Sequence, residues 1–202
     1  MTMQDDESER PFASLAAGAC PAYADLLLAL SAEFGAVDGD AVRDRLDDDS
    51  RALFGFGELP PLARADRLAA VMDRRLGLAA DADAGAAGLM FDEVVLRRRG
   101  HPAMLAAIGA ELALRAGVPA GVYASPRRWF VGVGLGEELV VLDARLGAGS
   151  AEPPDEVRAA CAHELAFCVL CGLGTAYTQQ GHDGAARHAG RLRLALPVLP
   201  RG

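Results

Sequence analysis

The fold is decided by the stretch RRRGHPAMLAAIGAELALRAGVPAGVY, residues 97–123, which joins a Gly-x-Pro turn to a long apolar run. Proline is well tolerated at the first position of a helix, because the N–H that it lacks would have no partner there. The run that starts at Pro102 is rich in Ala and Leu, and it stops at Gly117, a residue type that commonly ends helices. The stretch therefore predicts a buried helix over residues 102–116, followed by a strand.

The composition predicts one globular domain, or one domain with a small appendage, because the chain has 202 residues. Half of them (51%) are hydrophobic and only 5% are aromatic, so Ala, Leu and Val must fill most of the core. The net charge is −8, and the Arg residues are scattered among 28 acidic residues. Binding to nucleic acid or to an anionic membrane needs clustered positive charge. We therefore expect no nucleic-acid partner and no membrane partner.

The N-terminal residues MTMQDDESERPF are acidic and polar, and we expect a disordered tail over residues 1–12. This segment lacks the apolar core of a signal peptide. No apolar run reaches the roughly 18 residues that a membrane helix needs. The sequence thus predicts a cytoplasmic protein whose four cysteines are reduced thiols.

Apolar residues at helical spacing predict helices on both sides of the central run. Before it, residues 79–88 (AADADAGAAG) have low complexity and predict a flexible linker. After it, two helices are expected near the C-terminus. The predicted helices span residues 23–35, 38–54, 60–77, 89–100, 155–177 and 183–195.

Beyond Gly117 the apolar residues recur at every second position, a spacing that is typical of strands. Strands are predicted at 121–124, 128–135 and 138–144, with Gly136-Glu137 as a two-residue turn between the last two.

This register places Phe130 opposite Asp143 and makes Arg128 and Asp143 diagonal neighbours, roughly 7–8 Å apart at the backbone. Because side chains alternate along a strand, Gly132 and Gly134 share their face. Two glycines leave that face bare, so we expect the 102–116 helix to pack there, with its first turn near Asp143.

The segment GHPAMLAAIGAELALRAGVPAGV resembles the nucleophile helix of the transglutaminase-like (papain-like) core. In that core a Gly precedes the catalytic Cys by two residues, and the helix ends in Gly-(Ile/Val)-Pro-Ala. The segment RWFVGVGLGEELVVLDA is similar to the two following strands, which carry the catalytic His and Asp. A narrower resemblance, to the SirB1-like branch, rests on VVLRRRGHP, PRRWFV and VVLDA, and on tetratricopeptide-like residues 173–197.

The resemblance implies an α+β fold with a helical N-terminal region, a transglutaminase-like core and a C-terminal tetratricopeptide-like helical hairpin. In the core, the nucleophile-position helix packs on a small antiparallel sheet. The expected boundaries are 1–12 for the acidic tail, 13–78 for the helical region, 79–88 for the linker, 89–150 for the core and 151–202 for the hairpin.

Carried over by position, the family's catalytic Cys, His and Asp fall on Pro102, Arg128 and Asp143. Proline has no side-chain nucleophile, and Arg stays protonated and cannot act as a general base. Pro in place of the Cys is usual in the SirB1-like branch, but the missing His departs from its pattern. Acyl transfer by the family's mechanism is therefore excluded, and no catalytic residue is assigned.

The cysteines offer another candidate site, since Cys168-x-x-Cys171 lies near Cys161 and His163. A structural zinc site needs four tetrahedral ligands, normally from a loop as well as a helix. Free Cys is among the most buried residue types, so we interpret these three as core residues. Nothing around Cys20 activates it as a displaced nucleophile. No metal and no cofactor are expected.

The histidines are assigned mostly to structure. His101 either caps the 102–116 helix or faces the groove that replaces the active site, and the capping role is favoured. We expect His163, His182 and His188 to be surface residues of the C-terminal helices.

The leading functional hypothesis is a non-catalytic protein that binds a protein or acidic peptide partner. The candidate groove residues are His101, Arg128, Asp143 and Arg145. Arg128 either pairs with Asp143, as a replacement for the His–Asp hydrogen bond, or binds a carboxylate of the partner. One alternative is an enzyme that uses a non-standard nucleophile, and another is a scaffold that uses its C-terminal helices.

Overall fold

The computed structural model describes residues 11–19, 21–81, 83–145 and 157–197, so the predictions for residues 1–10 and for Cys20 lie outside it. The helices are α1 Phe12–Ala16, α2 Tyr23–Ala32, α3 Gly39–Ser50, α4 Pro61–Ala70, α5 Phe91–Arg97, α6 Pro102–Arg115, α7 Ala162–Gln179 and α8 Asp183–Arg193. Short helical turns occur at Arg51–Leu53, Phe56–Glu58, Val71–Arg75, Ala87–Leu89 and Gly136–Glu138. The strands are β1 Ala79–Ala80, β2 Arg99–Gly100, β3 Ala120–Ser125, β4 Arg128–Val133, β5 Val140–Asp143 and β6 Arg158–Ala160.

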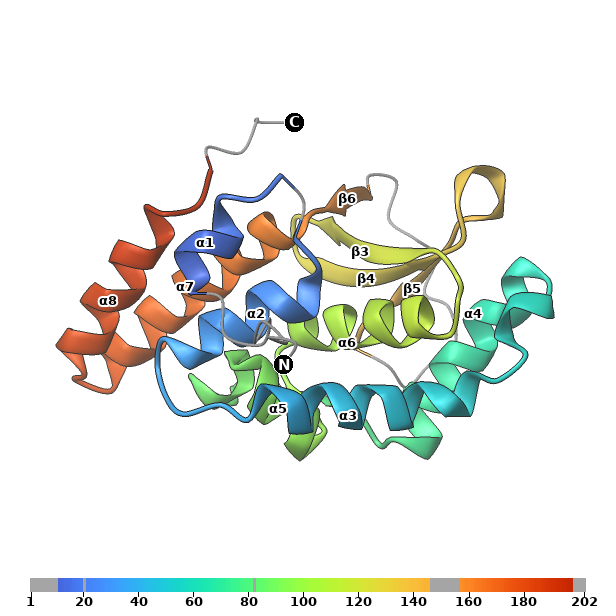
Figure 1. Ribbon diagram of the computed structural model, residues 1–202, viewed down its shortest axis with the longest axis horizontal. Helices are drawn as coiled ribbons and strands as arrows, with labels where there is room; N and C mark the ends of the chain where they lie inside the picture. The colour runs from blue at the N-terminus through green and yellow to red at the C-terminus, as the bar shows by residue number, and fades with distance from the viewer. Residues whose placement is uncertain (1–10, 20, 82, 146–156, 198–202) are drawn as a thin grey trace, which may run out of the picture.

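The molecule has the predicted α+β architecture, in which one antiparallel sheet packs on the central helix α6 (Figure 1). The sheet has four strands in the order β5-β4-β3-β6. Figure 1 shows α3 beneath α6, on the side away from the sheet, and the α7–α8 hairpin at the opposite end of the molecule from α4. The sheet, α6 and the N-terminal helices thus form three layers.

The register of the β4–β5 hairpin is as predicted, with Phe130 opposite Asp143. The predicted two-residue turn is wrong, because the strands part after Val133 and before Val140 and a short helical turn lies between them. Gly134 begins this loop with a φ of +95°. A β-carbon at Gly134 would lie 2.4 Å from the carbonyl oxygen of Glu138, so the loop closes only around glycine.

The sheet has a fourth strand where the sequence predicted helix. Residues 158–160 pair with β3 as its second antiparallel neighbour, and α7 begins only at residue 162. The Tyr23 hydroxyl links the two strands, since it donates to the Ala160 carbonyl oxygen (2.8 Å) and accepts from the Val122 N–H (3.2 Å). The core therefore extends past the predicted boundary at residue 150.

Helix α6 packs on the other face of the sheet from the one predicted. A β-carbon at Gly109 would lie 2.7 Å from Val131 Cγ2, so α6 lies against the face that carries Val131. The space beside Gly132 is filled by the ring of Tyr123, which a β-carbon there would meet at 2.2 Å. The glycine face of β4 is thus covered by a neighbouring side chain, and the small residue that permits close approach belongs to the helix.

Burial of α6 is nearly complete, since each residue from Ala103 to Ala113 is buried. Helices α2, α3 and α5 contact α6 in addition to the sheet. Because the sheet packs closely on one side of α6 and helices pack on the other, only short side chains fit along much of its length. The alanine content of the 102–116 run is therefore a packing requirement.

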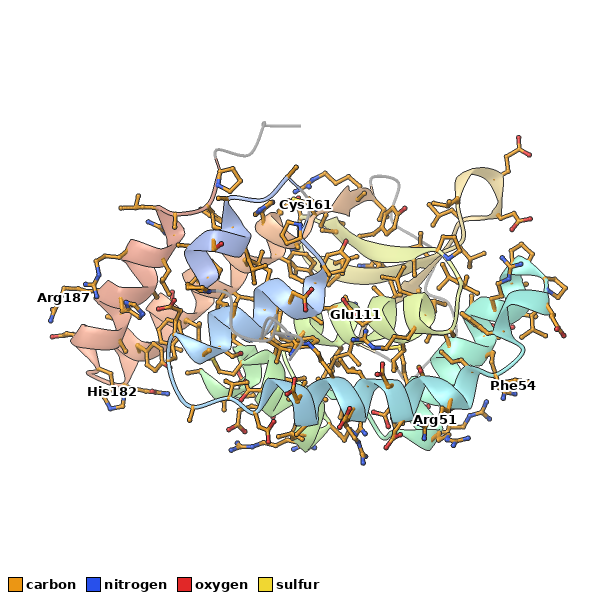
Figure 2. All side chains as sticks on the ribbon, in the orientation of Figure 1. Arg51, Phe54, Glu111, Cys161, His182 and Arg187 are labelled. Atoms are coloured by element: carbon orange, nitrogen blue, oxygen red, sulfur yellow. The ribbon has the colours of Figure 1, made fainter. Side chains whose placement is uncertain are left out.

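The one acidic residue of this buried run, Glu111, caps another helix. Its Oε1 accepts the Ala24 N–H at 2.9 Å, at the first turn of α2, whose own N-cap residue Ala22 makes no side-chain cap. Glu111 also forms an ion pair with Arg115, one turn along α6. Figure 2 shows Glu111 between α2 and α6. A buried carboxylate thus satisfies a helix N-terminus that would otherwise lack an acceptor.

Two further helix ends are capped across the fold in the same way. The Ser31 hydroxyl of α2 accepts the Phe91 N–H that begins α5, at 3.0 Å. The His163 Nε2 of α7 lies 3.0 Å from the Ala16 carbonyl oxygen that ends α1. His163 is only 3% exposed, so its prediction as a surface residue is wrong. Long-range caps of this kind fix the packing angles of the helices.

The N-terminal and linker boundaries differ from the predicted ones. Phe12 is fully buried and starts α1, so the fold begins inside the predicted tail. Of the predicted flexible linker, Ala79 and Ala80 form β1, which pairs in parallel with β2, and residues 87–89 form a helical turn. These segments are therefore part of the packed structure.

Helix α5 ends earlier than predicted, at Arg97, and Arg98 follows it with a φ of +61°. The left-handed region is unusual for a residue other than glycine. The guanidinium of Arg98 is held by the buried carboxylate of Asp49, with N–O distances of 2.9 and 2.5 Å. This ion pair between α3 and the end of α5 stabilises the backbone turn that leads into Gly100 and α6.

The C-terminal hairpin of α7 and α8 is present as predicted. It joins the rest of the molecule through α7, which contacts α2. An aromatic cluster supports the joint, because Phe34 stacks on Tyr177 (5.5 Å between ring centroids) and contacts the His188 ring. His188 also lies 3.2 Å from the Glu33 carboxylate.

The position of α6 makes a matched pair of glycine substitutions informative. Gly109→Ala should destabilise the protein by about 1–2 kcal/mol, because the added methyl group meets Val131 and Met72 at less than contact distance. Gly174→Ala, within α7 and with open space at its β-carbon, should stabilise it by up to about 1 kcal/mol. Urea unfolding followed by circular dichroism measures both, and equal effects would contradict the packing described.

Candidate functional site

The N-terminus of α6, which the sequence predicts to be the nucleophile position of the family it resembles, begins with Pro102, a residue without a reactive side chain. Pro102 is the first residue of the helix, and Ala103 and Met104 complete the start of its first turn. The His101 Nδ1 accepts the Ala103 N–H at 3.2 Å, so His101 caps the helix as favoured from the sequence. The residue that precedes the helix therefore caps its N-terminus.

Arg128 and Asp143, the positions predicted from the sequence for the family's His and Asp, form an ion pair. Arg128 Nη1 lies 3.6 Å from Asp143 Oδ2. The Arg128 guanidinium also lies over the Phe130 ring, 5.3 Å from its centroid. Of the two roles weighed for Arg128, the structure shows the pairing with Asp143.

Arg145 is the stronger partner of the same carboxylate. Its Nε and Nη2 donate to the two oxygens of Asp143 at 3.2 and 3.0 Å, and its backbone N–H donates to Oδ1 at 2.9 Å. We call Arg128, Asp143 and Arg145 the Arg–Asp cluster. Two guanidinium groups share one carboxylate, so the cluster has a net charge of +1.

The cluster determines the ionisation of Asp143. Burial raises the pKa of this carboxyl. The hydrogen bonds from the side chain and backbone of Arg145, together with the charges of Arg145 and Arg128, lower the pKa by more than burial raises it. The pKa of Asp143 is thus below its ordinary value. The carboxylate therefore stays ionised at neutral pH and cannot donate a proton there as a general acid.

The Arg–Asp cluster lies on the face of the sheet that points away from α6. Neighbouring residues of a strand point to opposite faces, and Val131 points to α6. Phe130 and its partner Asp143 therefore point to the other side, together with Arg128. Pro102 begins the helix on the first side, so the three carried-over positions do not converge on one centre.

His101 is also apart from the cluster. It lines a pocket between the segment before α5 and one face of α7, and Arg128, Asp143 and Arg145 are not among the lining residues. The four candidate groove residues thus divide between two places in the fold, the pocket and the outer face of the sheet.

The C-terminal cysteines lie on α7 and are each partly buried. Cys161 is the N-cap residue of the helix, whereas Cys168 and Cys171 line the pocket beside His101. Burial raises the pKa of the Cys168 thiol to about 11, so this thiol is protonated at neutral pH. In the part of the chain that the structure describes, no group of three or more His, Cys, Asp or Glu side chains could hold a metal ion.

Sequence reasoning missed the polar residues that position the site. Glu111 was detectable in principle, because a single carboxylate within an apolar helix predicts a buried partner. Tyr23 carries no such signal, since tyrosine at the start of a helix is ordinary. Burial raises the pKa of Tyr23, which keeps its hydroxyl protonated as the bridge between β3 and β6.

The family model described as the transglutaminase-like superfamily matches residues 39–161, from the start of α3 to the end of β6. The match covers more than half of the chain, and the protein belongs to this superfamily. No curated protein and no solved structure matches the chain. The matched region includes β6, in agreement with its place in the sheet, and it begins well within the region predicted as a separate helical part.

None of the helices that the structure describes has the length and apolar character needed to cross a bilayer.

The low pKa of Asp143 predicts a pH-dependent contribution to stability. A carboxyl group whose pKa is lower in the folded state stabilises that state at pH values above its pKa in the unfolded chain, about 4. This contribution is lost as the pH falls through the pKa of the folded state. Asp143→Asn should therefore lower stability at pH 7 and have a smaller effect near pH 3. Urea unfolding at both pH values tests this. The matched control is Asp66→Asn on the exposed side of α4, and an Asp143→Asn effect that does not change with pH would contradict the cluster.

Proposed function

We propose that this protein is a non-catalytic member of the transglutaminase-like superfamily, in its SirB1-like branch, that acts by binding a protein or peptide partner. The observation that carries the proposal is the start of α6, where Pro102 and the His101 cap replace the family's thiol. A helix N-terminus without a nucleophile keeps the architecture of the fold and loses its reaction.

The proposal does not depend on one alignment of the catalytic positions. The residues next to Arg128 and Asp143 that point toward α6 are Trp129 and Ala144, and both pack in the core. Ala144 N–H donates to the Trp129 carbonyl oxygen at 3.0 Å, which continues the β4–β5 ladder. Neither residue can abstract a proton or orient a base. Aligning the family's His and Asp with these two residues, one position further along the chain, therefore gives no catalytic pair either.

The Arg–Asp cluster is the surface that best fits an acidic partner. The Arg145 side chain is 56% exposed and that of Arg128 is 26% exposed, so both retain N–H groups that can reach a ligand. The neighbouring Arg127 is exposed as well. Guanidinium groups bind carboxylates with paired hydrogen bonds. Because the chain has a net charge of −8, a local excess of positive charge directs an acidic segment to this face.

The test is capture of partners from a lysate with the full chain as bait. The double variant Arg128→Gln and Arg145→Gln removes both positive charges while the amides can still donate to Asp143. Partners that bind through the cluster should be lost, or should bind at least about tenfold more weakly when measured individually. Quantitative mass spectrometry of the captured proteins measures the loss.

The matched control is Arg51→Gln, because Arg51 is 77% exposed and lies on the turn after α3 (Figure 2). Partners should survive this change. Thermal unfolding of each bait shows whether the variants are folded. Retention of every partner by a folded Arg128/Arg145 variant would contradict the proposed surface.

The C-terminal helices are a second candidate surface, favoured by one observation. Leu194, just after α8, is 83% exposed, and Arg187 and Arg191 are exposed on the helix itself. Figure 2 shows Arg187 and His182 at the outer end of this hairpin. A chain that ends at Gly181 removes α8 and leaves β6 and α7 in place. Partners lost only with this truncation would place binding on the hairpin.

A further inference from the structure

A pocket of about 550 Å³ lies between the segment before α5 and one face of α7. His101 forms part of its wall, so the pocket opens beside the N-terminus of α6. Small-molecule sites in proteins have volumes of roughly 300–1,000 Å³. The pocket is therefore large enough for a small molecule or for one long side chain of a peptide.

The charged groups of this pocket are carboxylates. Asp81 and Asp83 line it, and no Arg is among its lining residues in the part of the chain that the structure describes. Burial lowers the pKa of His101, so its imidazole is neutral at pH 7. The Cys168 thiol is neutral as well. The pocket thus has a negative side and otherwise uncharged walls, which favours a cation over an anion.

The helix end beside the pocket does not offset this preference. A helix N-terminus attracts anions through its free N–H groups. At α6, Pro102 has no N–H, and the Ala103 N–H is taken by His101 Nδ1. The groups that would bind an anion are therefore absent or occupied.

Part of the pocket wall is apolar and closely packed. Leu89 and Gly172 line it, and a β-carbon at Gly172 would lie 2.8 Å from Leu89 Cδ1. The side chain of Ala176 continues this wall along α7. Such a surface suits an alkyl chain that carries its charge at one end.

Arg193 of α8 does not line the pocket, but its positive charge lies next to Cys171. Its Nη1 lies 3.5 Å from Cys171 Sγ, and its guanidinium lies over the Phe167 ring, 5.6 Å from the centroid. The charge of a bound cation should therefore be repelled from Cys171 and lie at Asp81 and Asp83, so that the uncharged stem lies along α7 and covers Cys171.

We propose that this pocket binds an organic cation, an alkyl guanidinium or alkyl ammonium group, with its charge at Asp81 and Asp83 and its alkyl stem along Leu89 and α7. The charge is supplied either by a free small molecule or by an Arg or Lys side chain of a bound peptide. The site is separate from the Arg–Asp cluster and does not rest on the function proposed for it.

The two cysteines of the pocket provide the readout. N-ethylmaleimide labels Cys171 at a rate measured by peptide mass spectrometry, and Cys161, outside the pocket, is the internal standard. The probes are n-butylguanidinium, which carries one charge at one end of an alkyl chain, for a free cation and N-acetyl-arginine methylamide for a peptide side chain. Either probe, at about ten times its Kd, should slow the labelling of Cys171 about tenfold and leave that of Cys161 unchanged.

The double variant Asp81→Asn and Asp83→Asn should lose this protection, whereas Asp66→Asn, an exposed carboxylate of α4, should retain it. The Arg128→Gln and Arg145→Gln variant should also retain it, which separates this site from the proposed partner surface. Protection by n-butylguanidinium alone identifies a free cation, and protection by the arginine derivative alone identifies a side chain. The proposal is overturned if neither probe protects Cys171 at about 10 mM, or if the Asp81/Asp83 variant is protected as well as the native chain.

Discussion

The enclosure of α6 is the constraint on which the rest of the structure depends. A helix covered by a sheet on one side and by α2, α3 and α5 on the other can carry few large or charged side chains. The sequence meets this requirement with alanine, with Gly109 against Val131, and with Glu111, whose charge is used to cap α2 and to pair with Arg115. Each of these features allows other elements to approach α6 closely. The start of the same helix is the position that the sequence predicts for the family's nucleophile.

Much of the central fold could be predicted because its signals are local. Pro102 and Gly117 mark the ends of α6. The alternation of apolar residues in the two strands predicts the register that places Phe130 opposite Asp143. The face on which α6 packs could not be predicted in this way. Gly132 leaves a gap in the sheet, and whether a helix or a neighbouring ring fills it depends on the direction of Tyr123. That direction is set by tertiary packing.

The remaining errors have the same origin. Strand β6 is a three-residue segment with little strand propensity, and it is recruited by the free edge of β3 with the help of Tyr23. His163 looks like an exposed helical residue until α1 presents a carbonyl oxygen to it. Long-range contacts decide both cases. The pairing of Arg128 with Asp143 was one of two readings that the sequence left open, and the dominant contact of Arg145 with the same carboxylate was not anticipated.

The candidate site residues are held by contacts within the fold. The positions predicted for the family's Cys, His and Asp hold Pro102, Arg128 and Asp143, and the last two lie on the face of the sheet away from α6. The ion pair satisfies Asp143, and the His101 cap satisfies the helix end. Both positions are thereby stable without a substrate. The described residues thus form a guanidinium surface on the sheet and an acid-lined pocket beside α7.

The most direct test of this account is turnover by the purified full chain. The protein is incubated with a glutamine-containing peptide, with and without a fluorescent primary amine, and amide transfer and peptide hydrolysis are measured by mass spectrometry. The account predicts no product above the buffer blank, and the same result for Asp143→Ala and for a variant in which all four cysteines are replaced by Ala. Product formed by the native chain and lost in either variant would show that the protein is an enzyme with a different nucleophile.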